Sequence, residues 1–94
     1  MAPPIGDEMK LWAKVIDGEY LRANKVFRNS LPLTQDLYEE VLREICHELD
    51  LSTPVTLASH YRHLERFNIV EYKPRDFIEP VEFTKFVIEN VDYD

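Results

Sequence analysis

Alternating apolar and polar residues predict a β-hairpin near the start of the chain. Every second residue from Met9 to Val15 is apolar, and this period of two is typical of a half-buried strand. Asp17 and Gly18 follow, the dipeptide that most readily supplies the positive φ angles of a type I′ turn. The alternation resumes over Tyr20–Phe27, so we expect two antiparallel strands joined by this tight turn.

Apolar residues spaced by three and four after Thr34 predict an amphipathic helix that packs on the sheet. Thr34 can cap its first turn, where Asp36 suits the helix dipole. The apolar face carries Leu37, Tyr38, Val41, Leu42, Ile45 and Leu49. Asp50 tolerates a left-handed conformation, so we expect the helix to end there.

A second helix is expected directly afterwards, over residues 54–68. Thr53 is its predicted cap, and Pro54 suits the first helical position, where the missing N–H costs nothing. Its apolar stripe consists of Leu57, Ala58, Tyr61, Leu64 and Phe67. Small polar and basic residues occupy the opposite side.

Two later segments have the composition of strands. Ile69–Lys73 is short, and Val81–Val91 is rich in β-branched and aromatic residues. In the second segment Phe83 lies on one parity, whereas Phe86 and Ile88 lie on the other. Either both faces of this strand are covered or a bulge interrupts it.

Together these elements predict an α+β domain over residues 9–92, in the order strand, strand, helix, helix, strand. The N-terminal hairpin and the C-terminal strand form an antiparallel sheet, and both helices pack on one of its faces. Residues 1–8 contain two prolines and a glycine, and we expect them to form a flexible N-terminal arm.

The charge and the cysteine content narrow the partners and the compartment. The 94 residues carry 18 acids and 11 bases, a net charge of −7 that opposes contact with nucleic acids and anionic membranes. A single cysteine precludes an internal disulfide and fits a reducing compartment. The sequence shows neither a membrane span nor a signal peptide. We therefore expect a cytoplasmic protein.

Groups that could perform chemistry are few and scattered. The metal-ligand types outside the carboxylates are Cys46, His47, His60 and His63. They form neither a Cys-x-x-Cys nor a His-Glu-x-x-His pair, so they lack the usual zinc spacing. Cys46 lies near the end of an acidic helix, where the dipole opposes a thiolate. We predict no catalytic residue, no metal site and no cofactor.

One alternative function is DNA binding by a winged helix–turn–helix arrangement. The run Glu44–Ser52 and the 54–68 helix resemble the centre of such repressors, and the outward side of that helix is locally basic. The residues that would contact DNA are Ser59, Arg62, His63 and Arg66. Against this reading, the turn is one residue too long, the preceding helix is acidic, and a hairpin replaces the usual additional helix.

The preferred function is a non-enzymatic one, through protein–protein contact. Trp12 lies on the strand parity opposite the core side, so an open sheet face would expose an aromatic and aliphatic patch. Its members are Trp12, Ile16, Tyr20 and Val26. Such a patch suits a protein partner or a homodimer. Two alternatives stay open: the C-terminal segment covers this face, or the strand parity is reversed.

Three segments resemble a family of short bacterial proteins of unknown function, over Met9 to about Asp92. They are Met9–Lys14, the Cys-His-Glu-Leu-Asp run within Ile45–Asp50 with the following Pro54 and Leu57, and Asp76–Phe83. The chain departs from the family pattern at Thr56, where tryptophan is expected, and at Thr84, where aspartate is usual. The resemblance implies a stand-alone domain and carries over no functional residue.

Overall fold

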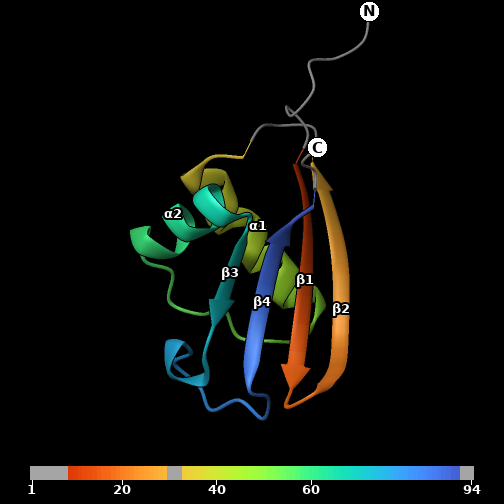
Figure 1. Cartoon of the computed structure of the whole chain (residues 1–94). Coiled ribbons are helices and arrows are strands. Elements are labelled where there is room, and N and C mark those ends of the chain that lie inside the picture. The colour runs from red at the N-terminus through yellow and green to blue at the C-terminus, as the bar shows by residue number, and fades with distance from the viewer. Residues whose placement is uncertain (1–8, 30–32, 92–94) are drawn as a thin grey trace, which may run out of the picture.

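The computed structural model describes residues 9–29 and 33–91, which form a four-stranded antiparallel sheet and two α-helices (Figure 1). The elements in chain order are β1 (Met9–Asp17), β2 (Tyr20–Asn29), α1 (Gln35–Glu48), α2 (Ala58–Phe67), β3 (Ile69–Tyr72), the 3-10 helix η1 (Pro74–Asp76) and β4 (Lys85–Asn90). The strands lie in the order β2-β1-β4-β3. The predicted arm, residues 1–8, lies outside the described residues.

The predicted hairpin is confirmed, and its core side is the one expected from the sequence. Met9, Leu11 and Val15 are buried. The turn differs from the predicted type I′ turn at Asp17–Gly18: Asp17 is the last residue of β1 and pairs with Tyr20, and within the turn only Gly18 has a positive φ, of 63°. The pairing contains an irregularity that the sequence pattern does not reveal. Val15 lies opposite Ala23, but the next residue, Ile16, lies opposite Leu21, so β2 carries an extra residue in a bulge.

Helix α1 has the predicted cap and the predicted apolar face. The Thr34 hydroxyl accepts a hydrogen bond from the Leu37 backbone N–H at 3.2 Å. The helix buries Tyr38, Val41, Leu42, Ile45 and Cys46. After the helix, Asp50 adopts a left-handed conformation with a φ of 59°, as expected for a residue that ends a helix.

Helix α2 begins four residues later than predicted, at Ala58 and not at Pro54. Residues 51–57 are irregular, because this segment is attached to the chain after β3: the Val55 N–H donates to the Asp76 carbonyl at 2.8 Å. Thr53 therefore caps no helix. The first turn of α2 is closed instead by the His60 imidazole, whose Nδ1 accepts from the Leu57 N–H at 2.9 Å.

The predicted apolar stripe of α2 is wrong at both of its ends. Leu57 precedes the helix and is 57% exposed, and Phe67 in its last turn is 58% exposed. Only Tyr61 and Leu64 are buried in this helix. Leu57 leaves the stripe because its backbone is extended, with φ −95° and ψ 161°, and Phe67 packs beside the exposed His63 ring, with the ring centroids 4.7 Å apart.

The C-terminal half adds one strand to the predicted order, which becomes β-β-α-α-β-β. Strand β4 pairs with both β1 and β3, so the last strand in the sequence is central in the sheet. The parity conflict disappears because β4 begins at Lys85. Phe83 precedes the strand and reaches the core from the preceding segment, while Phe86 and Ile88 enter it from β4.

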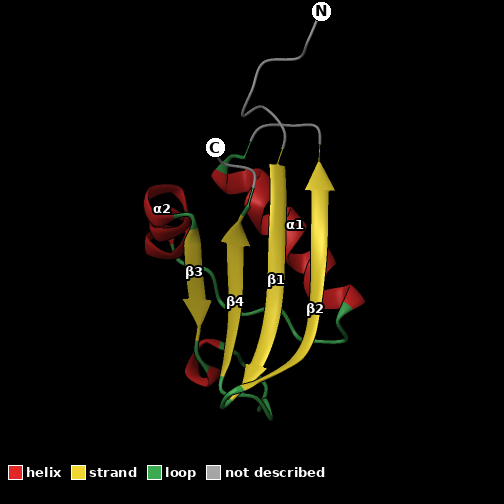
Figure 2. Ribbon diagram, turned by 45° about the vertical axis from the view of Figure 1, so that its right-hand side comes forward, coloured by secondary structure: helices red, strands yellow, loops and turns green. Residues whose placement is uncertain are grey.

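Both helices cover the same face of the sheet, as predicted, and no described element covers the other face (Figure 2). The hydrophobic core between the two layers draws on all four strands and both helices. Its largest fully buried side chains include Tyr38, Tyr72 and Phe86. The side chains on the sheet face without helices therefore lie outside this core.

Candidate functional site

The hairpin half of the open sheet face carries three of the four residues predicted to make contacts. Trp12 lies opposite Val26 in the β1–β2 register, and Ile16 is on the same row of β1. The predicted strand parity is therefore correct, and the C-terminal strand lies beside β1 and not over this face. Tyr20 lies opposite Asp17 and so belongs to the other row. Because of the bulge, Leu21 takes the place next to Ile16.

Trp12 is held in one orientation by its neighbours. Its indole N–H donates to the Asn24 side-chain oxygen at 3.2 Å, across the hairpin. The Lys14 ammonium lies 4.3 Å from the ring centroid, within the range of a cation–π contact. A large aromatic group that is already fixed loses little conformational entropy when a partner packs against it.

Ion pairs between neighbouring strands cover the half of the open face that β3 and β4 form. Lys14 pairs with Glu89 at 3.1 Å, and Lys85 pairs with Glu71 at 3.1 Å. Val87 lies among them on the same face, opposite Lys14 in the register, yet it is only 3% exposed. The aliphatic stems of the paired side chains cover it. Ile69, opposite Glu89 on the same face, is half-buried, whereas Leu21 and Val26 on the hairpin are 50% and 47% exposed.

Two cations face each other at one end of this accessible surface. Lys10 lies directly opposite Arg28. This is the next pair on the open face after Trp12 and Val26. Among the described residues, neither takes part in an ion pair. Like charges in directly opposed positions of a sheet are unfavourable, so an anion placed between them would relieve a repulsion. The local charge is thus opposite in sign to the net charge of −7.

We call this surface the open-face strip. It consists of Trp12, Ile16, Leu21 and Val26, with Lys10 and Arg28 at its cationic end. Sequence reasoning missed Leu21, because a bulge is invisible in the pattern, and it also missed the facing cations. The sequence alone gives no signal for the cations either, because pairing outward from Asp17 and Tyr20 without the bulge would place Lys10 opposite Phe27. The bulge brings Lys10 opposite Arg28.

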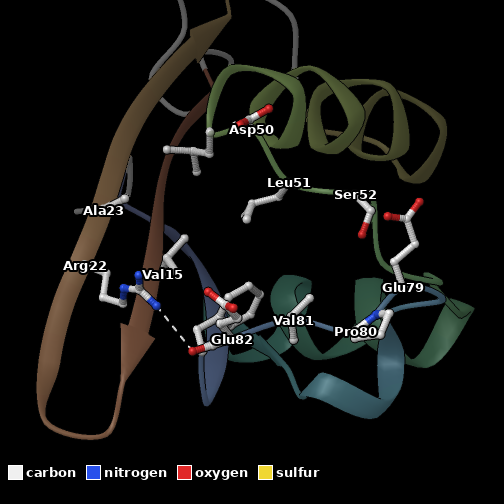
Figure 3. Close-up of a pocket in the computed structure, with 12 residues that line it drawn as sticks. Val15, Arg22, Ala23, Asp50, Leu51, Ser52, Glu79, Pro80, Val81 and Glu82 are labelled. Atoms are coloured by element: carbon white, nitrogen blue, oxygen red, sulfur yellow. Dashed lines mark hydrogen bonds between the residues drawn. The ribbon is translucent and has the colours of Figure 1, made fainter.

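A groove lies on the opposite, helix-bearing side of the sheet, at the hairpin end (Figure 3). Its volume is about 380 Å³. The apolar lining consists of Val15, Ala23, Leu49, Leu51, Pro80, Val81 and Phe83. The polar side chains around it are Arg22, Asp50, Ser52, Glu79 and Glu82. We call it the hairpin groove, and its boundary is held by the Arg22 guanidinium, which donates to the Glu82 carbonyl at 3.3 Å.

The four residues of the DNA-binding alternative are exposed together on α2. They are Ser59, Arg62, His63 and Arg66. However, nine residues, 49 to 57, separate α1 from α2, whereas a helix–turn–helix uses a turn of three to four. Strands β3 and β4 also belong to the sheet of the hairpin and do not form a separate wing. The geometry disfavours a winged helix–turn–helix.

The two histidines of α2 use the same ring atom in opposite ways. The His60 Nδ1 accepts a hydrogen bond from a backbone N–H, so it carries no proton. The His63 Nδ1 lies 2.6 Å from the Ile69 carbonyl, which can only accept, so this nitrogen is protonated. The described residues bring no three of His, Cys, Asp and Glu into one cluster that could hold a metal ion.

Cys46 is enclosed in the core and is poorly suited to nucleophilic chemistry. Its side chain is fully buried, and burial raises the pKa of the thiol to about 12. The thiolate, which is the nucleophilic form, is therefore scarce near neutral pH. His47, the next residue, is exposed on the other side of α1 and does not accompany it.

Comparison of the chain with protein-family models, curated proteins and solved structures yields no match. The resemblance to short bacterial proteins stays a prediction. Neither helix within residues 9–29 and 33–91 has the length and apolar character needed to cross a membrane.

Proposed function

We propose that this protein is a non-enzymatic interaction protein that binds an acidic segment of a partner protein through the open-face strip. The observation that carries the proposal is the arrangement of this strip. A fixed aromatic ring and accessible aliphatic side chains lie beside two facing cations, on a sheet face that no described element covers. Apolar anchors next to a charged rim are the usual anatomy of a protein-binding surface.

The charge favours a different protein over a second copy of this chain. In a symmetric dimer, the same patch meets itself. Two open-face strips would bring to one interface four cations that form no ion pair within residues 9–29 and 33–91: Lys10 and Arg28 from each copy. Like-charge juxtaposition at an interface opposes association. A partner that carries carboxylates between apolar residues would satisfy both parts of the strip.

The surface also suits a protein better than a nucleic acid. Proteins that bind single strands offer a series of aromatic platforms along a basic groove. Among the described residues, the open face carries one aromatic side chain, Trp12, and its cations Lys14 and Lys85 are occupied by ion pairs. The net charge of −7 further opposes a polyanion.

Two features support a non-enzymatic role in the cytoplasm. The single cysteine is buried with a raised pKa, which fits a structural thiol in a reducing compartment. The histidines of α2 use their Nδ1 atoms for backbone contacts. These two contacts give both side chains a role in the fold.

The proposal is tested with a synthetic ten-residue peptide in which glutamate alternates with valine and isoleucine. Trp12 is the only tryptophan, so its fluorescence reports binding at the strip directly. We expect saturable binding that weakens with salt. The double variant Lys10→Glu/Arg28→Glu should weaken it about tenfold or more. The matched control is Lys73→Glu/Arg75→Glu, which makes the same charge change beside η1 and should leave binding within about threefold.

Three results would contradict this function. The first is equal binding of a peptide with lysine in place of glutamate. The second is tighter binding of a single-stranded oligonucleotide than of the acidic peptide. The third is a stable dimer in light scattering that dissociates on Trp12→Ala, which would show that a second copy occupies the strip.

A further inference from the structure

The hairpin groove is a place where the apolar core reaches the surface. Four apolar side chains that line it are only partly buried and pack against the edge of the core: Ala23, Leu49, Leu51 and Val81. Neither helix extends over this end of the sheet (Figure 1). In Figure 3, Leu51 reaches toward the middle of the groove from the segment after α1, and Val81 lies below it on the facing segment.

The groove is open and of the size that small molecules occupy. Its volume of about 380 Å³ lies within the range of roughly 300–1,000 Å³ that is typical of small-molecule sites. Such sites combine an apolar lining with a few polar groups that fix orientation. Here Leu51 and Val81 supply the apolar contact, and the polar groups stand around them.

The charge around the groove is negative. Asp50, Glu79 and Glu82 contribute three carboxylates, and Arg22 is the one cationic side chain of the lining. Arg22 is already engaged, since its guanidinium donates to the Glu82 carbonyl at 3.3 Å and lies 3.9 Å from the Asp17 carboxylate. A ligand therefore meets an excess of carboxylates, with Glu79 and Ser52 together at one end (Figure 3).

We propose that the hairpin groove binds a small aliphatic amine. The hydrocarbon chain would lie on Leu51 and Val81, and the ammonium group would be placed at Glu79, with the Ser52 hydroxyl as a second acceptor. An apolar chain alone would not use the carboxylates, and a carboxylate ligand would be repelled by them. This site is independent of the open-face strip, because the two surfaces lie on opposite sides of the sheet.

The test uses three probes of equal chain length: hexylamine, hexanoate and hexanol. Binding is followed by NMR through the methyl signals of Leu51 and Val81 in the full chain at neutral pH. We expect hexylamine to shift both signals saturably, with a dissociation constant about tenfold or more below that of hexanoate. Raised salt should weaken the binding of hexylamine and leave that of hexanol unchanged.

Variants that replace glutamate with glutamine test which carboxylates bind the amine. Glu79→Gln/Glu82→Gln removes two carboxylates and should weaken hexylamine binding about tenfold, to near the level of hexanol. The matched control, Glu40→Gln/Glu65→Gln, removes two carboxylates from exposed positions of α1 and α2 and should leave binding unchanged. All four positions are exposed, so the variants should keep the fold, which circular dichroism checks.

Two outcomes would overturn this proposal. One is equal binding of hexanoate and hexylamine, which would mean that the carboxylates select nothing. The other is binding of a lysine-containing peptide at Leu51 and Val81 with no binding of hexylamine, which would assign the groove to a partner protein.

Discussion

The hydroxyl groups of Tyr38 and Tyr72 meet at 2.7 Å inside the core, and this hydrogen bond joins α1 to β3. Both side chains are fully buried. Tyr72 has a second neighbour, since the Thr56 hydroxyl lies 3.3 Å from its own. The two tyrosines are thus unequal: Tyr72 keeps a partner when Tyr38 is changed, whereas Tyr38 has no other hydrogen-bond partner among the described residues.

This inequality predicts different effects for two equivalent substitutions. Tyr72→Phe leaves the Tyr38 hydroxyl buried and unsatisfied, and should lower the free energy of unfolding by about 2–3 kcal/mol. Tyr38→Phe should cost about 1 kcal/mol, because Thr56 remains. The double variant should cost less than the sum of the two. Urea unfolding measures all three, and equal effects of the single variants would contradict the proposed network.

Stability should fall at alkaline pH. Burial raises the pKa of the Cys46 thiol to about 12, and burial also raises the pKa of Tyr38 and of Tyr72. Because these pKa values are higher in the folded chain than in the unfolded one, the unfolded chain loses its protons first as the pH rises. The stabilisation is complete below about pH 8 and is lost at higher pH, by up to about 1.4 kcal/mol per pH unit for each group.

The cysteine contribution can be isolated with Cys46→Ala. The variant lacks the thiol that ionises only on unfolding, so its free energy of unfolding should fall less steeply between about pH 9 and 11 than that of the wild type. Its stability at neutral pH should be lower, because a buried side chain is truncated. Urea unfolding at each pH measures both, and parallel pH profiles for the two proteins would refute the assignment.

The caps of the two helices provide a paired test of the fold. Thr34→Ala removes the hydroxyl that accepts from the Leu37 N–H, and should lower the free energy of unfolding by about 1 kcal/mol. Thr53→Ala should cost less than about 0.5 kcal/mol, because Thr53 lies five residues before α2 and caps nothing. Thermal or urea unfolding distinguishes them. A larger loss of unfolding free energy for Thr53→Ala than for Thr34→Ala would contradict this expectation and would support the helix start at Pro54 that the sequence predicts.

Asn68 ends α2 in a left-handed conformation with a φ of 62°. Asn68→Ala should therefore cost about 1 kcal/mol, because a Cβ-bearing residue without a local polar group is strained there. Asn68→Gly should be neutral or slightly stabilising, since glycine adopts this conformation freely. Matched melting temperatures for the alanine and glycine variants would show that the backbone conformation is not the cause.

The outcome at the second helix shows why local signals can mislead. A threonine followed by a proline is a sound helix start by itself, and the sequence therefore predicts a start at Pro54. In the folded chain Pro54 is buried, and the next residue, Val55, donates its N–H to the Asp76 carbonyl at 2.8 Å. The two bonded residues, 55 and 76, are 21 positions apart in the chain, so no local sequence pattern predicts their contact.

The candidate site was predictable in part. Trp12, Ile16 and Val26 follow from strand alternation alone, because a side chain opposite the core row must face outward. The exchange of Tyr20 for Leu21 comes from the bulge after Val15, and the burial of Val87 comes from ion pairs between strands distant in sequence. The hairpin groove is built from both strands of the hairpin and from residues 49–52 and 79–83, and none of these segments carries a signal for it by itself.

The sequence by itself determined the elements whose causes are local: the hairpin through alternation and Asp17–Gly18, and α1 through its apolar spacing and the Thr34 cap. Only the tertiary structure decided the strand order, with β4 inserted between β1 and β3, and therefore which surfaces stay open. The physical reason is that turn and cap energies depend on neighbours in the chain. Strand insertion and groove formation depend instead on contacts between segments that become neighbours only after folding.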